Sequence, residues 1–146
     1  FVLNDYAVAG ALRDGTIKLW QTRPDFQRNP IEEFRANHGA AEKLFQRRDG
    51  SIVAGYEDGS LCVFRRQQGL VQTLVGHTSR IEKIIELDRD ILATQSIEGI
   101  RLFNREGTCI AYRQGHALWQ VSHRTLAYVS MPDHIPKLLT FPTIYD

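Results

Sequence analysis

The chain has 146 residues and a mass of 16.7 kDa, which suits one domain or a piece of a larger one. Hydrophobic residues make up 42% and charged residues 24%, and this globular composition excludes wholesale disorder. Lys and Arg number 18 against 17 Asp and Glu, so no overall field draws the chain to nucleic acid or membrane. The 2 cysteines cannot form a disulfide scaffold, and we expect an intracellular protein of unassigned compartment.

Taken in chain order, the predicted elements begin with strands on either side of Asp14-Gly15, and the same pattern returns at Asp58-Gly59. Asp-Gly between apolar runs is a strong hairpin signal, because both residues tolerate the positive φ of a tight turn. Glu98-Gly99 is a weaker copy of this turn. Apolar residues alternate at period two after each turn, which predicts strands; these pairs are Ile17 and Leu19, Leu61 and Val63, and Ile100 and Leu102.

A second sequence marker recurs at nearly the same spacing as the turns. A small or polar residue followed by histidine recurs every 39 residues, at His38, His77 and His116. Each repeat between markers accommodates four short strands and no helical stripe with caps. A four-stranded sheet that recurs about every 40 residues is typical of a β-propeller blade. We therefore predict an all-β chain of about 3.5 to 4 blades, with repeats at residues 1–37, 38–76, 77–115 and 116–146.

These markers together resemble the WD40 repeat. The stretch from Gly76-His77 through Glu98-Gly99 to Phe103 is the clearest copy, and Leu19-Trp20-Gln21 lies where that family has its Trp-Asp signature. The sequence departs from the pattern by replacing the Trp with Phe64 and Phe103 in later repeats. The resemblance covers nearly the whole chain and implies an incomplete propeller ring.

The resemblance also implies a structural role for the histidines. In WD40 blades a His, the turn acid, a strand hydroxyl and the Trp form a buried hydrogen-bonded set, which fits the need of buried polar groups for partners. The implied pairs are His38 with Asp58, His77 with Glu98, and His116 with Asp133, with Thr94 or Ser96 supplying a hydroxyl. At this spacing the histidines would point to different places, so we predict no metal site and no cofactor.

Three explanations fit an incomplete ring. The chain is a segment of a longer propeller, it completes a ring with a second copy or another chain, or it closes as four blades. We favour the first, because the sequence starts at Phe1 and not at Met. The expected partners therefore include further blades from the same longer chain or from another chain.

The resemblance implies a disc with two loop faces, and both faces are candidates for binding. On the face of the Gly-His loops we select the types of residue that anchor interfaces, namely Arg13, Tyr56, Arg80 and Trp119. The loops of the opposite face hold 9 arginines against 6 acids, a modest basic excess. The arginines are Arg23, Arg28, Arg47, Arg48, Arg65, Arg66, Arg89, Arg105 and Arg124, and the acids are Asp5, Asp25, Asp49, Asp88, Asp90 and Glu106.

Catalysis has no motif to support it. The sequence lacks a nucleophile elbow, a phosphate-binding P-loop and a zinc-protease motif, and Cys62 and Cys109 have no paired spacing. We predict a non-catalytic scaffold for a protein or peptide partner, on the analogy of the family. A half-propeller with a structural role, and a basic-faced module for nucleic acid or anionic lipid, are the alternatives; nucleic acid is the less favoured partner.

Overall fold

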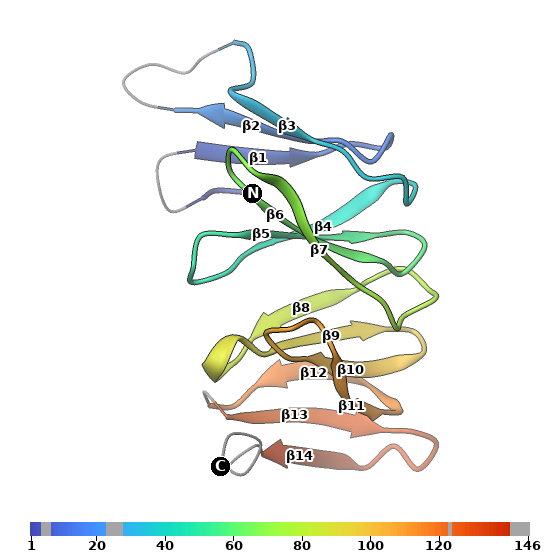
Figure 1. Ribbon diagram of the computed structural model, residues 1–146. Helices are drawn as coiled ribbons and strands as arrows, with labels where there is room; N and C mark the ends of the chain where they lie inside the picture. The colour runs from blue at the N-terminus through green and yellow to red at the C-terminus, as the bar shows by residue number, and fades with distance from the viewer. Residues whose placement is uncertain (4–6, 23–27, 123, 141–146) are drawn as a thin grey trace. The chain divides into compact units, whose positions relative to one another are not determined.

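The computed structural model describes residues 1–3, 7–22, 28–122 and 124–140, and these form four antiparallel sheets (Figure 1). Arg23, Asp5 and Asp25 of the opposite face lie outside the described residues. The strands of the first two sheets are β1 (Ala7–Ala11), β2 (Ile17–Gln21) and β3 (Glu32–Phe34), then β4 (Ala41–Gln46), β5 (Ile52–Tyr56), β6 (Leu61–Arg65) and β7 (Gly69–Leu74). Those of the last two are β8 (Lys83–Glu86), β9 (Leu92–Ser96), β10 (Gly99–Phe103) and β11 (Cys109–Arg113), then β12 (Gly115–Gln120), β13 (Thr125–Ser130) and β14 (Pro136–Thr140).

In each sheet neighbouring strands follow one another along the chain, so every sheet is an up-and-down meander. The described residues contain one short 3₁₀ turn, η1 (Asp88–Asp90), between β8 and β9. The all-β prediction is confirmed. No helix among the described residues is long and apolar enough to cross a membrane.

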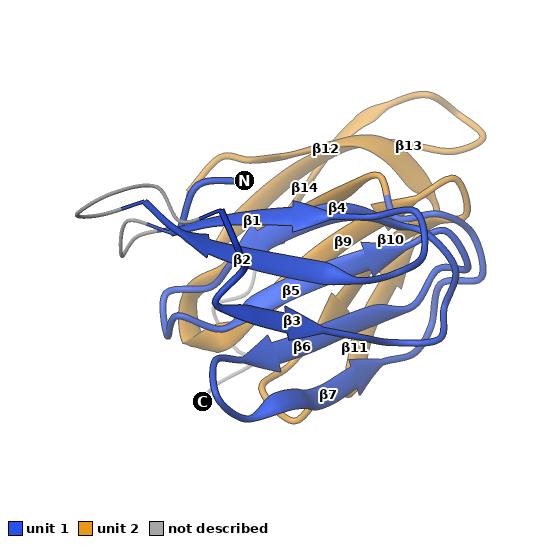
Figure 2. Cartoon of the chain, turned by 90° about the horizontal axis from the view of Figure 1, so that it is seen from above, with its two compact units in different colours: residues 1–81 blue, residues 82–146 orange. Residues whose placement is uncertain are grey.

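The chain divides into two compact units, which Figure 2 shows in blue and orange. The first, residues 1–81, holds the sheets β1-β2-β3 and β4-β5-β6-β7. The second, residues 82–146, holds β8-β9-β10-β11 and β12-β13-β14. Each unit therefore contains two sheets, and each has its own hydrophobic core.

The core of the first unit follows the predicted alternation. Ile17 and Leu19 are fully buried, whereas Lys18 between them is partly exposed. The rings of Phe34 and Phe64, from β3 and β6, stack with centroids 4.9 Å apart. All residues of β5 are buried, so both faces of this strand are covered.

The hairpin turns explain why the repeat needs glycine. Gly15 and Gly59 both have φ of +90°, a conformation that residues with a side chain rarely adopt. A Cβ on Gly59 would also lie 2.5 Å from the carbonyl oxygen of His77. The preceding aspartates complete the turns: Asp14 accepts the N–H of Thr16 at 2.9 Å, and Asp58 accepts that of Ser60 at 2.8 Å.

The N-terminal segment pairs with β1. The N–H of Ala9 donates to the carbonyl of Phe1 at 2.8 Å, and the N–H of Leu3 donates to Ala7 at 2.8 Å. The segment forms an isolated bridge between Val2 and Val8 and not a regular strand.

Candidate interaction sites

The pair of His38 and Asp58 is present at one end of the second sheet. His38 Nδ1 lies 2.9 Å from Asp58 Oδ2, and the second carboxylate oxygen accepts the backbone N–H of Ser60. Burial alone would raise the pKa of Asp58, but the hydrogen bonds from Ser60 and His38 outweigh it and hold that pKa below its usual value. The side chains are 30% and 43% exposed, so the pair is half-exposed and not buried as the resemblance implied.

Tyr56 is not available to a partner. Its side chain is fully buried, and its hydroxyl donates to the carbonyl of Gly15 at 3.2 Å. Its ring also lies against that of His38, with centroids 5.6 Å apart. Burial raises the pKa of the Tyr56 hydroxyl. The expectation that Tyr56 anchors a partner is therefore wrong, because the ring fills the space between two turns of the first compact unit.

The second implied pair joins residues of different compact units. His77 is buried in the first unit, whereas Glu98 lies in the second, where Ser96 donates to its carboxylate at 3.3 Å. The pairing of these two residues stays a prediction. Thr94 is fully buried and its hydroxyl donates to the carbonyl of Arg101 on the neighbouring strand at 3.4 Å.

The third implied pair does not form. Asp133 accepts the hydroxyl of Ser130 and lies 3.8 Å from the Lys137 ammonium. These two contacts, the hydrogen bond first, hold the pKa of Asp133 below its usual value. His116 is exposed and its ring meets that of His134, with centroids 6.2 Å apart. His116 lacks this partner for a local reason: Asp133 closes its own turn by accepting the hydroxyl of Ser130, three residues away.

The other three predicted anchors are accessible. Arg13 is exposed at the β1–β2 turn, and the Arg80 side chain is 66% exposed while pairing with Glu42 at 2.9 Å. Trp119 is 44% exposed on β12, although its neighbour Leu118 is buried in the core.

A recurring ion pair that the sequence patterns did not indicate lies at the other end of the sheets. Arg65 Nη2 lies 2.8 Å from Asp49 Oδ2, and Arg105 Nε lies 2.8 Å from Asp90 Oδ2. Each pair joins the turn before the second strand of a sheet to a residue at the end of the third strand (Arg65) or just after it (Arg105). The signal was an Asp in the turn and an Arg one or two residues after the aromatic residue, at Phe64 and Phe103.

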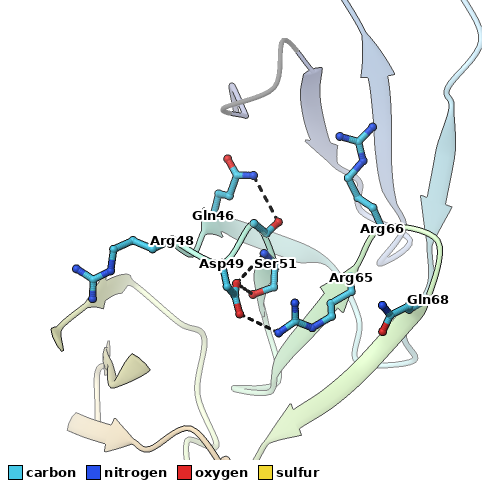
Figure 3. Close-up of a pocket in the computed structure, with 8 residues that line it drawn as sticks. Gln46, Arg48, Asp49, Ser51, Arg65, Arg66 and Gln68 are labelled. Carbon is cyan, nitrogen blue, oxygen red and sulfur yellow. Dashed lines mark hydrogen bonds and ion pairs between the residues drawn. The ribbon is translucent and has the colours of Figure 1, made fainter. Parts of the chain in front are cut away.

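Asp49 also marks a basic pocket in the first unit (Figure 3). The pocket measures about 460 Å³, and its lining includes 3 arginines and 1 acid. Figure 3 shows Arg65 pointing toward Asp49, whereas Arg48 and Arg66 point away from it. Burial would raise the pKa of Asp49, but hydrogen bonds from Ser51 and the nearby arginines lower it below the usual value. The lining residues with polar side chains are Gln46, Arg48, Asp49, Ser51, Arg65, Arg66 and Gln68.

A second pocket, of about 340 Å³, lies in the second unit at the end that carries the Gly115-His116 marker. Acidic and amide groups line its wall, and Ile97 and Met131 are the exposed apolar residues. The lining residues are Glu82, Gln95, Ser96, Ile97, Glu98, Gln114, Gly115, His116 and Met131. This volume is within the range of small ligand sites.

Neither the cysteines nor the potential metal-ligating residues of the described ranges form a further candidate site. Cys62 is buried, which raises its pKa to about 11, and Cys109 is a free thiol that is partly buried. No group of three or more His, Cys, Asp or Glu able to hold a metal occurs within the described ranges.

Four meandering sheets in sequence, with hairpin turns and histidine markers at a period near 40 residues, form the blades of an incomplete β-propeller. Solved structures of WD40 propellers share this fold. The C-terminal WD40 domain of Sif2 matches 97% of this chain with a TM-score of 0.80 and 18% identity, and the WD40 repeats of RRP9 match 96% with 0.75 and 14%. The chain covers 44% and 49% of those two structures, less than half of each.

The computationally designed Ika4 protein also has this fold, with a TM-score of 0.76 and 21% identity. The match covers 96% of this chain and 88% of the designed protein. No protein-family model matches the sequence, and no curated protein matches it. The predicted fold is thus confirmed, while these identities carry no information about function.

Proposed function

We propose that the chain is a non-catalytic scaffold that binds a peptide segment of a protein partner at a surface that includes Trp119 on β12. Antiparallel sheets hold the side chains of such a surface in fixed positions, so little conformational entropy is lost when a partner binds. The intracellular setting stays a prediction that rests on the sequence.

One observation supports the proposal above others. Trp119 is 44% exposed, although the adjacent Leu118 is 1% exposed and therefore fixed in the core of the second unit. An exposed Trp on a rigid strand is the residue type that most often dominates binding energy at interfaces. Its apolar surface would otherwise remain in water, and covering it is favourable.

A peptide selection tests the proposal. Random peptides displayed on phage are selected on the 146-residue chain, and their affinities for Trp119→Ala and Leu70→Ala are compared. Leu70 is 47% exposed on β7 and provides a matched loss of exposed apolar surface. We expect Trp119→Ala to weaken binding by about tenfold or more, with no change for Leu70→Ala. Equal effects of the two substitutions, or selection of no peptide, would overturn the proposal.

A second candidate function is docking on anionic lipid or nucleic acid, favoured by the excess of arginine in the pocket of Figure 3. Arginine forks bind phosphate oxygens in two places at once. The test is binding to vesicles of phosphatidylcholine with and without phosphatidylserine, and to single-stranded DNA, at several salt concentrations. Docking predicts steep salt dependence and loss on Arg66→Gln but not on Arg35→Gln, whose side chain is 75% exposed beside Glu33. Salt-independent or absent binding would exclude this function.

A further inference from the structure

The pocket of the second unit contains an amide group that the fold satisfies at one end only. Gln95 is 8% exposed, and its Oε1 accepts the N–H of Leu118 at 2.9 Å. Because only the oxygen of an amide accepts an N–H, this bond fixes which end carries the nitrogen, Nε2. Nε2 has no hydrogen-bond partner among the described residues. Arg101 Nε is the one unpartnered side-chain atom of the described chain that is sealed from solvent, so Gln95 Nε2 is reached from the pocket that Gln95 lines.

The repeat pattern does not require glutamine at this position. The equivalent residues, four before the turn glycine of the earlier repeats, are Ala11 and Gly55. A Cβ on Gly55 would lie 2.8 Å from the Ile81 side chain, which leaves no room for a longer side chain there. Gln95 therefore places an amide N–H donor where the two earlier repeats have none. An unused donor in a nearly buried amide is satisfied by an oxygen, which comes from water or from a ligand.

The turn beside Gln95 also departs from the earlier repeats. Two residues before the turn glycine, Ile97 stands where those repeats have Arg13 and Glu57. Ile97 is 84% exposed, Met131 is 36% exposed, and both line the same pocket as Gln95. The pocket thus combines a free N–H donor with apolar surface, and an apolar group that covers this surface binds favourably.

One residue of an extended peptide meets both features, since it offers a backbone carbonyl oxygen and a side chain. The pocket is also close to the surface of the proposed function. Gly115 lines the pocket, and Trp119 lies four residues further along the same strand, β12. Four residues of a strand span at most about 13 Å. A short extended segment of the partner is therefore long enough to reach from Trp119 to the pocket.

We propose that this pocket binds one residue of an extended partner peptide, and that this residue has an apolar side chain. Its backbone carbonyl accepts from Gln95 Nε2, and its side chain covers Ile97 and Met131. Binding uses one hydrogen bond and apolar area, and it needs no ion pair. The proposal rests on the proposed function and names the residue chemistry of the partner, which the scaffold function alone does not specify.

Two peptides test the apolar requirement. They are a capped Gly-Ser heptapeptide with one central leucine and the same peptide with serine in its place. Binding to the 146-residue chain is followed by the NMR signals of the Gln95 side-chain amide. We expect the leucine peptide to shift these signals and to bind about tenfold more tightly than the serine peptide. A purely structural role of Gln95 would leave its Nε2 signals unmoved by either peptide.

A matched pair of variants tests the donor. Gln95→Glu keeps an oxygen for the Leu118 N–H but replaces the donor with a second acceptor, and it should weaken the leucine peptide by about tenfold or more. Gln114→Glu adds the same charge at an exposed lining residue and keeps the donor, so affinity should stay within about twofold. An unmoved Leu118 amide signal shows that Gln95→Glu retains the internal bond. If that signal moves, the Gln95 signals of the unaltered chain decide.

A second pair tests the apolar surface. Ile97→Ser should weaken the leucine peptide by about threefold, whereas Val75→Ser, at a 76% exposed site outside the pocket, should not change it. Equal binding of the two peptides, or equal effects within either pair of variants, would overturn the proposal. If peptides selected on the chain depend on Trp119 while the leucine peptide leaves the Gln95 signals unmoved, the scaffold function stands and this proposal alone fails.

Discussion

His38 and Asp58 lie 20 residues apart in the sequence, yet their Nδ1 and Oδ2 atoms are 2.9 Å apart. The contact joins the loop before β4 to the β5–β6 turn, so it closes one end of the second sheet. Asp58 makes a second hydrogen bond in the β5–β6 turn, because it also accepts the N–H of Ser60. The two residues therefore contribute unequally to stability.

A double-mutant cycle measures this inequality. We expect His38→Ala to lower the free energy of unfolding by about 0.5 kcal/mol, because the pair is half-exposed. Asp58→Ala should cost about 1–2 kcal/mol, since it also removes the turn hydrogen bond. Urea unfolding of both single variants and of the double variant gives the coupling free energy between the His38 and Asp58 side chains. Glu57→Ala, at the exposed neighbouring position, is the control; if it costs as much as Asp58→Ala, the turn bond has no specific role.

The aspartates of the turns predict how stability depends on pH. Asp14, Asp49, Asp58 and Asp133 all have a pKa below the usual 3.8 in the folded chain. A group whose folded pKa is depressed stabilises the fold above its unfolded pKa, and this contribution is lost as pH falls through the folded pKa. The stabilisation by these aspartates should therefore be constant above about pH 5. The midpoint temperature of thermal unfolding should fall progressively as the pH drops below the usual aspartate pKa. A smaller acid loss is expected in the Asp49→Asn variant; an unchanged acid loss would contradict the assignment of Asp49.

Two glycines separate the effects of backbone strain and steric overlap. Gly50 and Gly59 have φ of +89° and +90°, but a Cβ on Gly50 meets nothing within 4 Å. A Cβ on Gly59 would lie 2.5 Å from the His77 carbonyl oxygen. We expect Gly50→Ala to cost about 1 kcal/mol and Gly59→Ala clearly more. Chemical unfolding of the two variants measures the free energy of unfolding that each one loses. Equal losses would show that the His77 loop moves aside freely.

The last described strand predicts self-association. Among the described residues β14 pairs only with β13, and Leu138 on it is 68% exposed. An exposed apolar edge strand is a template for pairing with another chain. Leu138→Lys should therefore reduce concentration-dependent association in sedimentation velocity, while Leu70→Lys on β7 should have less effect. Association that is the same in both variants would place the contact elsewhere.

Local patterns in the sequence were enough to predict the sheets. Asp14-Gly15 and Asp58-Gly59 specify turns by their own backbone preferences, and Ile17 and Leu19 specify the inward face of β2 by their spacing. The position of Tyr56 could not be inferred in this way, because its burial depends on Gly15, 41 residues earlier. Only the folded chain shows which turn-flanking residues are covered.

The candidate pocket of the second unit was also beyond the sequence patterns. Its wall combines Glu82, Gln95 and Met131 from three segments that share no motif. Gln95 differs from its counterparts Ala11 and Gly55, but a repeat comparison alone cannot tell whether such a difference is tolerated or used. The unpartnered Nε2 became visible only once the bond to Leu118 was known.

The burial of Cys62 gives the protein an internal reporter of its own opening. Its thiol is fully covered on the central strand β6, and the raised pKa leaves almost none of it as the reactive thiolate near neutral pH. Alkylating reagents, or glutathione disulfide by thiol–disulfide exchange, can modify this sulfur only when the second sheet transiently unfolds. The rate of that modification therefore reports how readily the second sheet opens.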